Sequence, residues 1–538
     1  MYARTQMETL VKTTSTQYFI AAAVIGGLAF TTIATTAQAQ ADPAPTTIVS
    51  VQSPSARFSE LANLPFPQGS ASNETAQALK DELLFQRSTQ AYLWAMPAIM
   101  SLGMQVGSEK AFGGGYNVLP IWKSLTDSKV LIVTPNTVTM YAVGYLDLGK
   151  EGALVVELPP MLIGFMSDFM AVPIPADGGV FAGDVGVNGP DGGKGGKYLL
   201  LPPGYKDAVP EGYYVYRSGM NSVMVTLRAF VADPSKMAEA VAHLEKTRIY
   251  PLDSAIKAKP MVFPDASKPG LNMLPIEDGS AFDHLQRLID REGDDFASPD
   301  WRGVLASIGI VKGQPFNPDA RTRKILEQGA VTGFKTARVL ANEAVLLTGV
   351  STLVYPDRKW TNPFPSGSST KQLAINTAFL NASGHFLDLD SRAGYYSMSW
   401  GISPSMVKEA TPGKGGFYAV ATVDNEGEAL SGNNNYRLHF PAGVPAKLFW
   451  SVTLYDAYTT SLLVGERLFP SLSSTEKPVQ NNDGSTDLYF GPRAPSGKAG
   501  NWLPTKPGRN YIAILRLYGP TEAALDKSWK PSDLERVK

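Results

Sequence analysis

The sequence predicts a mainly β protein of the α+β class, in which two antiparallel β-sandwich domains are joined by a helical connector. Three observations lead to this prediction. Short apolar runs of strand length recur in two separate regions, long segments of helical period are few, and Gly and Pro are frequent, at 50 and 40 of 538 residues. Glycine and proline at the turns between many short strands are typical of sandwiches.

The amino terminus has the layout of a secretory signal peptide, which we predict over residues 1–39. Basic residues precede an apolar run (19–30), and small residues ending at Ala39 follow it. The run is about a dozen residues, short of the roughly 20 that a membrane-spanning helix needs, so an uncleaved anchor is the weaker alternative. We therefore expect a periplasmic or secreted protein with no stable membrane span after cleavage. Translation starts at either Met1 or Met7.

Composition divides the rest of the chain into four parts. Residues 40–72 are rich in Pro, Ser, Thr and Ala and predict a flexible leader. We expect the first β-sandwich domain over 73–263, the helical connector over 264–346 and the second β-sandwich domain over 347–538. The mature length, about 500 residues, exceeds one ordinary core. At roughly 100–200 residues per domain it suggests two or three domains, and we predict two.

Local signals place the elements within these domains. Ser72 or Asn73 can cap a helix that Pro97 ends or kinks, and Asn317-Pro318 opens a connector helix with Asn as its cap. Runs of strand length between turn residues predict the strands. They cover 130–134, 140–148, 153–158, 197–201, 213–217 and 222–230 in the first domain, and 415–423, 435–440, 447–456, 487–491 and 510–519 in the second.

The strand 447–456 shows the clearest alternation in the chain. One face carries Leu448, Trp450, Val452 and Leu454, and the other carries Phe449, Ser451, Thr453 and Tyr455. This pattern predicts a half-buried strand with one face on the core and one in solvent.

Charge and cysteine content exclude several classes of function. Lys and Arg number 48 against 49 Asp and Glu, so there is no basic excess to bind nucleic acid. The absence of cysteine excludes disulfides and thiolate metal sites. The four histidines are scattered along the chain, and we predict neither a metal site nor a cofactor. The loop with Asp483 and Asp487 offers oxygen ligands for calcium, but its Asp-Gly pair is also an ordinary turn signal.

Common catalytic signatures do not occur in the sequence. There is neither a Gly-x-Ser-x-Gly elbow nor a His-Glu-x-x-His motif. In the glycine-rich run 189–196, Lys194 is followed by Gly rather than Ser or Thr. A hairpin loop therefore explains this run better than a phosphate cradle does.

The first candidate site lies on strands of the second domain. Arg437 and His439 share one strand face, and Tyr455 and Asp456 end another strand. If the two strands are neighbours, these groups converge, and Arg437, His439 and Asp456 become candidate catalytic residues with Tyr455 in a binding role. An imidazole beside a carboxylate and a guanidinium can orient and protonate a substrate. A structural ion pair at a strand end is the alternative.

The second candidate site follows the PNTVTMY segment of the first domain. Asn136 after proline predicts a turn, with Thr139 and Tyr141 then pointing to one side of the following strand. Tyr141 is a candidate general acid or hydrogen-bond donor, and a turn anchored by an aromatic ring is the alternative reading. Arg217 and Arg228 lie on predicted strands, where arginine is either solvated, structurally paired or placed to recognise an anion or a sugar.

Several longer strings carry a resemblance to a known family. They are QAYLWAMP (90–97), PNTVTMYAVGYLDL (135–148), ASIGIVKGQPF (306–316), YRLHFPAGVPAKLFWSVTLYD (436–456), NNDGSTDLYFGP (481–492), NWLPT (501–505) and YIAILRLYGP (511–520). Through them the chain resembles the bacterial family of paired domains of unknown function, the 1254 type followed by the 1214 type. The resemblance implies two jelly-roll-like sandwiches, a tendency to form homo-oligomers and no agreed activity.

The chain departs from this family at one position of the first domain. The family usually shows an acidic residue in a pattern like P-N-x-D-T-x-Y, and this chain has Val138 there. If that carboxylate takes part in chemistry in relatives, the chemistry is lost or altered in this chain. Asn136, Thr139 and Tyr141 carry over as candidates only.

Two hypotheses of function follow. The first is an exported, hydrolase-like enzyme that acts on a small organic or saccharide substrate. The alternative is a non-catalytic ligand-binding or structural envelope protein, since sandwiches host both roles. A carboxylate and a Tyr or His that converge in one concave pocket would favour the enzyme.

Overall fold

The computed structural model describes residues 54–137, 139–231, 234–267, 270–364, 385–407, 412–413 and 415–537. The chain divides into two compact units, one ending at Leu64 and one beginning at Pro65. The described part of the first unit contains helix α1 (Pro54–Ala62), so part of the leader expected over 40–72 is helical. Proline suits the first turn of a helix, and Ala, Glu and Leu are good helix formers. The predicted signal peptide lies outside the described residues.

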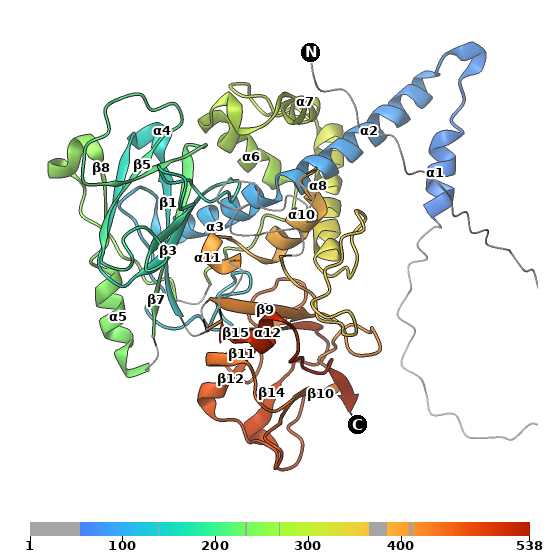
Figure 1. Cartoon of the computed structure of the whole chain (residues 1–538). Coiled ribbons are helices and arrows are strands. Elements are labelled where there is room, and N and C mark those ends of the chain that lie inside the picture. The colour runs from blue at the N-terminus through green and yellow to red at the C-terminus, as the bar shows by residue number, and fades with distance from the viewer. Residues whose placement is uncertain are drawn as a thin grey trace, which may run out of the picture. The chain divides into compact units, whose positions relative to one another are not determined.

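The described strands of the second unit form four sheets of four strands each, and these sheets make two β-rich domains (Figure 1). The first domain has sheets of order β1-β7-β3-β4 and β6-β5-β2-β8. Its strands are β1 (Thr139–Asp147), β2 (Leu154–Leu158), β3 (Ile163–Asp168), β4 (Asp184–Gly186), β5 (Gly196–Leu201), β6 (Tyr214–Arg217), β7 (Ser222–Phe230) and β8 (Arg248–Pro251). Neighbouring strands run antiparallel except β5 and β6.

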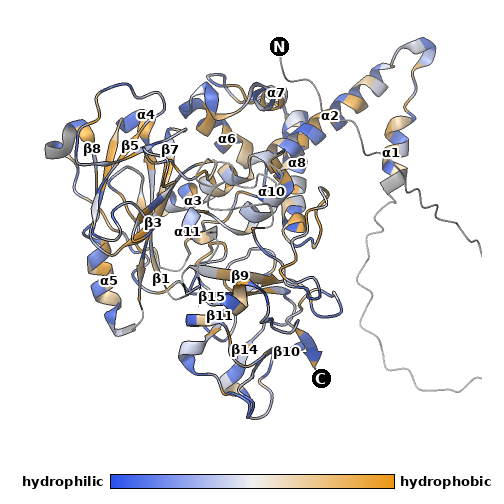
Figure 2. Cartoon of the chain, in the orientation of Figure 1, coloured by the Kyte–Doolittle hydropathy of each residue, from blue (hydrophilic) through white to orange (hydrophobic). Residues whose placement is uncertain are grey.

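The two sheets of the first domain pack face to face. Met140 of β1 and Val225 of β7 belong to the same buried cluster as Val156 of β2 and Leu200 of β5. Successive strand residues point to opposite faces, so Tyr141 and Val143 lie on the far face of the first sheet, in the helical core. Figure 2 shows how strongly apolar strands such as β5 and β7 are. The β1-β7-β3-β4 sheet is therefore covered on both faces.

The second domain has the same two-sheet construction. Its sheets have the orders β14-β13-β10-β16 and β12-β11-β15-β9. Its strands are β9 (Gly416–Ala421), β10 (Asn435–Phe440), β11 (Ala446–Asp456), β12 (Ser471–Ser473), β13 (Thr486–Gly491), β14 (Trp502–Pro504), β15 (Tyr511–Pro520) and β16 (Glu535–Val537). Leu438 and Phe440 of one sheet pack against Val452 and Leu515 of the other. The mainly β fold with two β-rich domains is thereby confirmed.

The strand β11 differs from its prediction in two respects. Trp450, Val452 and Leu454 face the core of the sandwich as expected, but Leu448, predicted on the same face, is exposed, at an irregularity of the β11–β15 register between Ala446 and Phe449. However, every residue from Phe449 to Asp456 is buried, including Ser451 on the opposite face. The strand is thus not half-buried, because its outer face packs against the rest of the chain instead of meeting solvent.

Helices join the two β-rich domains and cover the outer face of the β1 sheet (Figure 1). The described helices of the second unit are α2 (Asn73–Trp94), α3 (Met96–Phe112), α4 (Leu148–Glu151), α5 (Met237–Leu244), α6 (Ser280–Arg291), α7 (Pro299–Ser307), α8 (Ala320–Leu340), α10 (Leu389–Met398), α11 (Pro404–Val407) and α12 (Glu522–Leu525). Short 3-10 helices are η1 (Pro67–Gly69), η2 (Pro234–Lys236), η3 (Leu252–Lys257), η4 (Asp294–Phe296), η5 (Ser474–Glu476) and η6 (Ala499–Asn501). None of the helices in the described part of the chain combines the length and apolarity that a membrane crossing requires.

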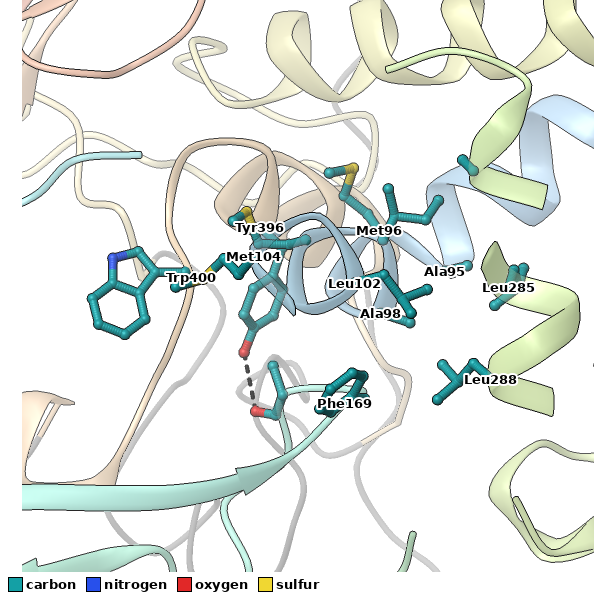
Figure 3. Packing of buried hydrophobic residues seen from close by; sticks show 14 of the residues in the cluster. Ala95, Met96, Ala98, Leu102, Met104, Phe169, Leu285, Leu288, Tyr396 and Trp400 are labelled. Carbon is teal, nitrogen blue, oxygen red and sulfur yellow. Dashed lines mark hydrogen bonds between the residues drawn. The ribbon is translucent and has the colours of Figure 1, made fainter. Parts of the chain in front are cut away.

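The helical core connects elements that are far apart in sequence. Figure 3 shows residues of one buried cluster: Leu102 of α3, Leu285 and Leu288 of α6, Tyr396 of α10, and Phe169, which follows β3. The Tyr396 hydroxyl donates a hydrogen bond of 3.3 Å to a backbone carbonyl just beyond Phe169. The first β-rich domain and the helices therefore share one core.

Capping residues explain where the long helices begin and end. Ser72 caps α2 by accepting a hydrogen bond from the Thr75 amide, and α2 ends just before Pro97, as predicted. The cap of α8 is Asp319 rather than the predicted Asn317, because the Asp319 side chain accepts from the Thr322 amide. Both helices lie in the second unit, where they pack closely against each other.

Candidate functional site

A cavity lies between facing sheets of the two β-rich domains. Its walls come from β1, β3 and β7 of the first domain, from β9 and β15 of the second, and from the segment that includes α10 and α11. The space open to the centres of water molecules measures about 90 Å³. Roughly 10–15 Å³ of such space holds one water. The cavity can thus hold several waters or one small organic molecule.

Arg228 is the first cationic side chain in the wall. It lies on the central strand β7 directly opposite Tyr141 of β1, so both point to the cavity side of the sheet. Its guanidinium carbon is 5.4 Å from the Tyr141 ring centroid and 5.8 Å from that of Phe165. The buried Nε of Arg228 has no hydrogen-bond partner among the described residues. A terminal nitrogen lies 3.9 Å from the sulfur of Met406, a weak acceptor.

Arg516 is the second cationic side chain, and it enters from the opposite sheet. It lies on the central strand β15 between Tyr418 of β9 and Ser451 of β11, and it is only 6% exposed. Its guanidinium carbon is 5.5 Å from the Tyr455 ring centroid. Burial works against the charge of Arg516, but neighbouring tyrosines, Tyr455 first, outweigh it and raise its pKa above the usual value. The side chain is therefore a buried permanent cation.

The charge balance of the cavity is positive. Neither Arg228 nor Arg516 forms an ion pair with a carboxylate in the described part of the chain. Buried Asp184 interacts electrostatically with Arg228. Its carboxylate accepts hydrogen bonds from the Ser405 amide (2.9 Å) and hydroxyl (2.7 Å). Burial raises the pKa of Asp184 to about 6, although these hydrogen bonds and Arg228 act in the opposite direction. At neutral pH Asp184 is mostly ionised and offsets part of the Arg228 charge, whereas no described carboxylate does so for Arg516.

The turn before β1 ties the two domains together at the cavity. The side-chain amide of Asn136 donates a hydrogen bond to the Tyr518 hydroxyl at 2.7 Å, and the Tyr455 hydroxyl donates one to the Pro135 carbonyl at 2.8 Å. Thr134, in the wall, has a φ of 37°, a left-handed conformation that a β-branched residue rarely adopts. Surrounding hydrogen bonds hold it there, since its amide donates to a backbone carbonyl at 2.7 Å and its hydroxyl to another at 2.7 Å. Such strain is typical of ligand sites.

An aromatic segment closes a third side of the cavity. The Trp400 ring contacts Tyr141 edge to face at 5.6 Å and Phe165 at 6.4 Å between centroids. Gly401 lies so close that a Cβ there would stand 2.4 Å from Cζ of Phe165. The Tyr395 hydroxyl holds the segment by donating to the Gly401 carbonyl at 2.6 Å. Only glycine fits this position without displacing the aromatic wall.

Three of the residues predicted in the first domain meet at this cavity. Asn136, Tyr141 and Arg228 all line it. Thr139 lies at the start of β1 with a buried hydroxyl that has no partner among the described residues, outside the lining. Arg217 is elsewhere: it forms an ion pair with Asp177 at 2.8 Å, and about half of each side chain is exposed. Asn136 and Tyr141 of PNTVTMY therefore line a cavity, and their role in a functional site stays a prediction.

The second-domain residues do not converge as expected. Arg437 and His439 share the outer face of β10, but β10 and β11 belong to different sheets. Arg437 pairs with a glutamate of β16 at 2.6 Å, and His439 pairs with Asp487 at 2.8 Å. Asp456 accepts from nearby amides and pairs with an arginine at 3.0 Å. Arg437 and Asp456 therefore make structural ion pairs, and His439 makes a hydrogen bond with Asp487. Of the group only Tyr455 reaches the cavity, through its contact with Arg516.

Sequence reasoning missed the most telling residue of the site. Arg516 interrupts an apolar strand, NYIAILRLYG, that forms the middle of its sheet. A charge on a strand that is buried on both faces needs a partner, and this signal was readable. Tyr418 and Trp400 carry no comparable signal, because aromatic residues are ordinary in cores.

The loop considered for calcium has a local explanation. The Asp483 carboxylate accepts from the Ser485 amide at 2.9 Å and the Ser485 hydroxyl at 2.6 Å. In the regions that the structure describes, no group of three or more His, Asp or Glu side chains is placed to hold a metal ion. The loop is a turn with an Asp cap.

Two family models match the chain on either side of the cavity. The model described as "Protein of unknown function (DUF1254)" matches residues 116–251, and the model described as "Protein of unknown function (DUF1214)" matches residues 415–522. The chain carries these two domains in this order. Arg228 lies in the DUF1254 domain and Arg516 in the DUF1214 domain, so the cavity forms where the paired domains meet.

Two crystal structures are among the matches to this chain. The VPA0106 protein from Vibrio parahaemolyticus is 18% identical, with a TM-score of 0.49 and coverage of 85% of this chain and 100% of that one. An uncharacterized protein from Burkholderia cenocepacia is 13% identical, with a TM-score of 0.36 and coverage of 86% and 97%. No curated protein matches the chain. Function is therefore inferred from the cavity itself.

Proposed function

We propose that the cavity between the DUF1254 and DUF1214 domains binds a small organic carboxylate. The observation that carries the proposal is buried Arg516, which shares the cavity with Arg228 and has no carboxylate partner among the described residues. An unpaired buried charge costs several kcal/mol, on the order of the penalties seen when one partner of an ion pair is removed. A bound carboxylate would offset that cost, since the guanidinium fork matches its two oxygens.

The size and lining of the cavity favour a short aliphatic acid. A cavity of about 150 Å³ accommodates a benzene ring, and this one measures about 90 Å³. Aromatic acids and saccharide rings are thus disfavoured. Phe165, Val420 and Ile514 also line it, and such an apolar wall suits a carbon chain better than inorganic phosphate, whose whole surface is polar.

The lining favours binding over hydrolysis. The polar groups that it contributes are guanidinium groups, hydroxyls and one amide, which hold an anion without serving as a base near neutral pH. Of the two functions considered from the sequence, the ligand-binding one is the better supported. Together with the amino-terminal pattern of residues 1–39, this supports an exported protein that captures a small acid outside the cytoplasm.

The test is isothermal titration of the mature protein with acetate, propionate, butyrate, benzoate and phosphate. We expect the short aliphatic acids to bind, and Arg516→Met to weaken them by about 30-fold or more, since hydrogen bonds to a charged group contribute about 1.5–3 kcal/mol each. Arg516→Lys, which keeps the charge, should retain part of the affinity. The matched control is Arg217→Met, which removes an arginine outside the cavity.

Three outcomes count against the proposal. Equal affinity in the wild type and in a folded Arg516→Met variant would place the binding site elsewhere. Phosphate or benzoate as the best ligand would contradict the choice of a short aliphatic acid, which rests on the apolar lining and the volume of the cavity. Turnover of ester or amide substrates that depends on Arg516 would return the hydrolase hypothesis to first place.

A further inference from the structure

We infer that Arg228 recognises a second, uncharged oxygen of the ligand, so that the cavity takes a short oxo- or hydroxycarboxylate rather than a simple fatty acid or a dicarboxylate. This inference rests on the proposed carboxylate site and assigns a different task to each arginine. Arg516 holds the carboxylate, and Arg228 selects among carboxylates.

Unused donors surround Arg228. Its Nε is buried without a hydrogen-bond partner among the described residues, and a terminal nitrogen meets only the sulfur of Met406. Two further hydroxyls of the lining, those of Tyr141 and Tyr418, form no hydrogen bond with a described residue, although neither oxygen is fully buried. Buried donors are almost always paired. A ligand that carried oxygen only in its carboxylate would leave this side of the cavity unpaired.

The charge balance decides what kind of oxygen fits there. Asp184 lies near enough to Arg228 for the two charges to attract, and at neutral pH its carboxylate offsets part of the Arg228 charge. A second carboxylate beside Arg228 would meet this buried negative charge across a medium of low polarity, where like charges repel strongly. A carbonyl or hydroxyl oxygen accepts the same hydrogen bonds without that repulsion.

The surroundings of Arg516 support the same division of tasks between the two arginines. Arg516 is surrounded by tyrosine rings and the Thr134 carbonyl and has no carboxylate nearby among the described residues. Asp184, which lies behind the lining, places a negative charge near Arg228. The two ends of the cavity thus differ in charge, and a ligand with one charged and one neutral polar end matches them.

The experiment is isothermal titration at pH 7.5 of the mature protein with pyruvate, lactate, propionate and malonate. We expect the wild type to bind pyruvate or lactate at least about tenfold more tightly than propionate, the difference that one hydrogen bond to a charged group makes. Malonate should bind more weakly than pyruvate. In Arg228→Met the preference for the oxygenated acids should disappear, while the dissociation constant of propionate changes by less than about threefold.

A second variant and a control keep the result interpretable. Arg228→Lys retains the charge on the strand and covers the case in which Arg228→Met fails to fold, and Arg217→Met should keep the full preference. Equal affinity for pyruvate and propionate in the wild type, a preference that survives Arg228→Met, or tighter binding of malonate would each overturn the inference. If no acid binds at all, the proposed carboxylate site fails instead, so the two failures are distinguishable.

Discussion

Buried Asp168 is expected to make the protein less stable as the pH rises from about 4 to about 7. This residue ends β3, is 7% exposed, and accepts a hydrogen bond of 3.0 Å from the Val172 amide. Burial raises its pKa to about 7, and the nearby charge of buried Glu292 acts in the same direction. An unfolded aspartate has a pKa of about 3.9. Between these values the folded state holds a proton that the unfolded state has released.

The sign and size of the effect follow from this difference. A folded pKa above the unfolded one means that stability is highest below pH ~4 and is lost as the pH rises toward 7. About 3 units at ~1.4 kcal/mol each give a loss of about 4 kcal/mol. Asp168→Asn removes the titration but keeps an acceptor for the Val172 amide. The variant is therefore expected to gain stability relative to the wild type by about that amount between pH 4 and pH 8.

The assay is urea unfolding of both proteins at pH 4.5, 6 and 7.5, followed by tryptophan fluorescence. Asp184→Asn is the matched control, because the pKa of Asp184 is raised to about 6. The difference in free energy of unfolding between this variant and the wild type should therefore level off at a lower pH. A difference between Asp168→Asn and the wild type that stays constant with pH would refute the reasoning. So would a wild type that loses stability on acidification where Asp168→Asn does not.

Other predictions concern packing, the place of the site and export. Gly401→Ala should destabilise the fold by about 1–3 kcal/mol, because its Cβ would lie 2.4 Å from Phe165; an unchanged melting temperature would contradict this. His439→Gln should leave propionate binding unchanged, since β10 is outside the cavity lining, and titration checks it. Intact-mass measurement of exported protein should show a start between Gln38 and Asp42, whereas retention of the first thirty residues would indicate a membrane anchor.

The fold was accessible from the sequence because its signals are local. Turn residues, strand-length apolar runs and caps such as Ser72 act over a few positions, and they indicated the two β-rich domains and the helices between them. The cap of α8 was misplaced by two residues, since Asn317 and Asp319 are equally good caps by type and only the chain geometry selects one. The burial of both faces of β11 was missed because it depends on what the other domain brings to that face.

The site was accessible only in part, because it forms between domains. Local patterns singled out Asn136, Tyr141 and Arg228 within the first domain. They could not show that Arg516 faces them, since contacts between distant segments leave no trace in spacing. The grouping of Arg437 with Asp456 assumed that consecutive strands are neighbours, and the alternation of β10 and β11 between two sheets separates them.

The most direct test of the cavity as a carboxylate site is a crystal structure of the mature protein grown with 3-bromopropionate, using the anomalous signal of bromine to locate the acid. The account predicts a bromine peak inside the cavity, with the carboxylate within hydrogen-bond distance of Arg516. The same crystals of Arg516→Met should lack the peak. Bromine density only on the surface, or a cavity that holds ordered water alone at saturating acid, would contradict it.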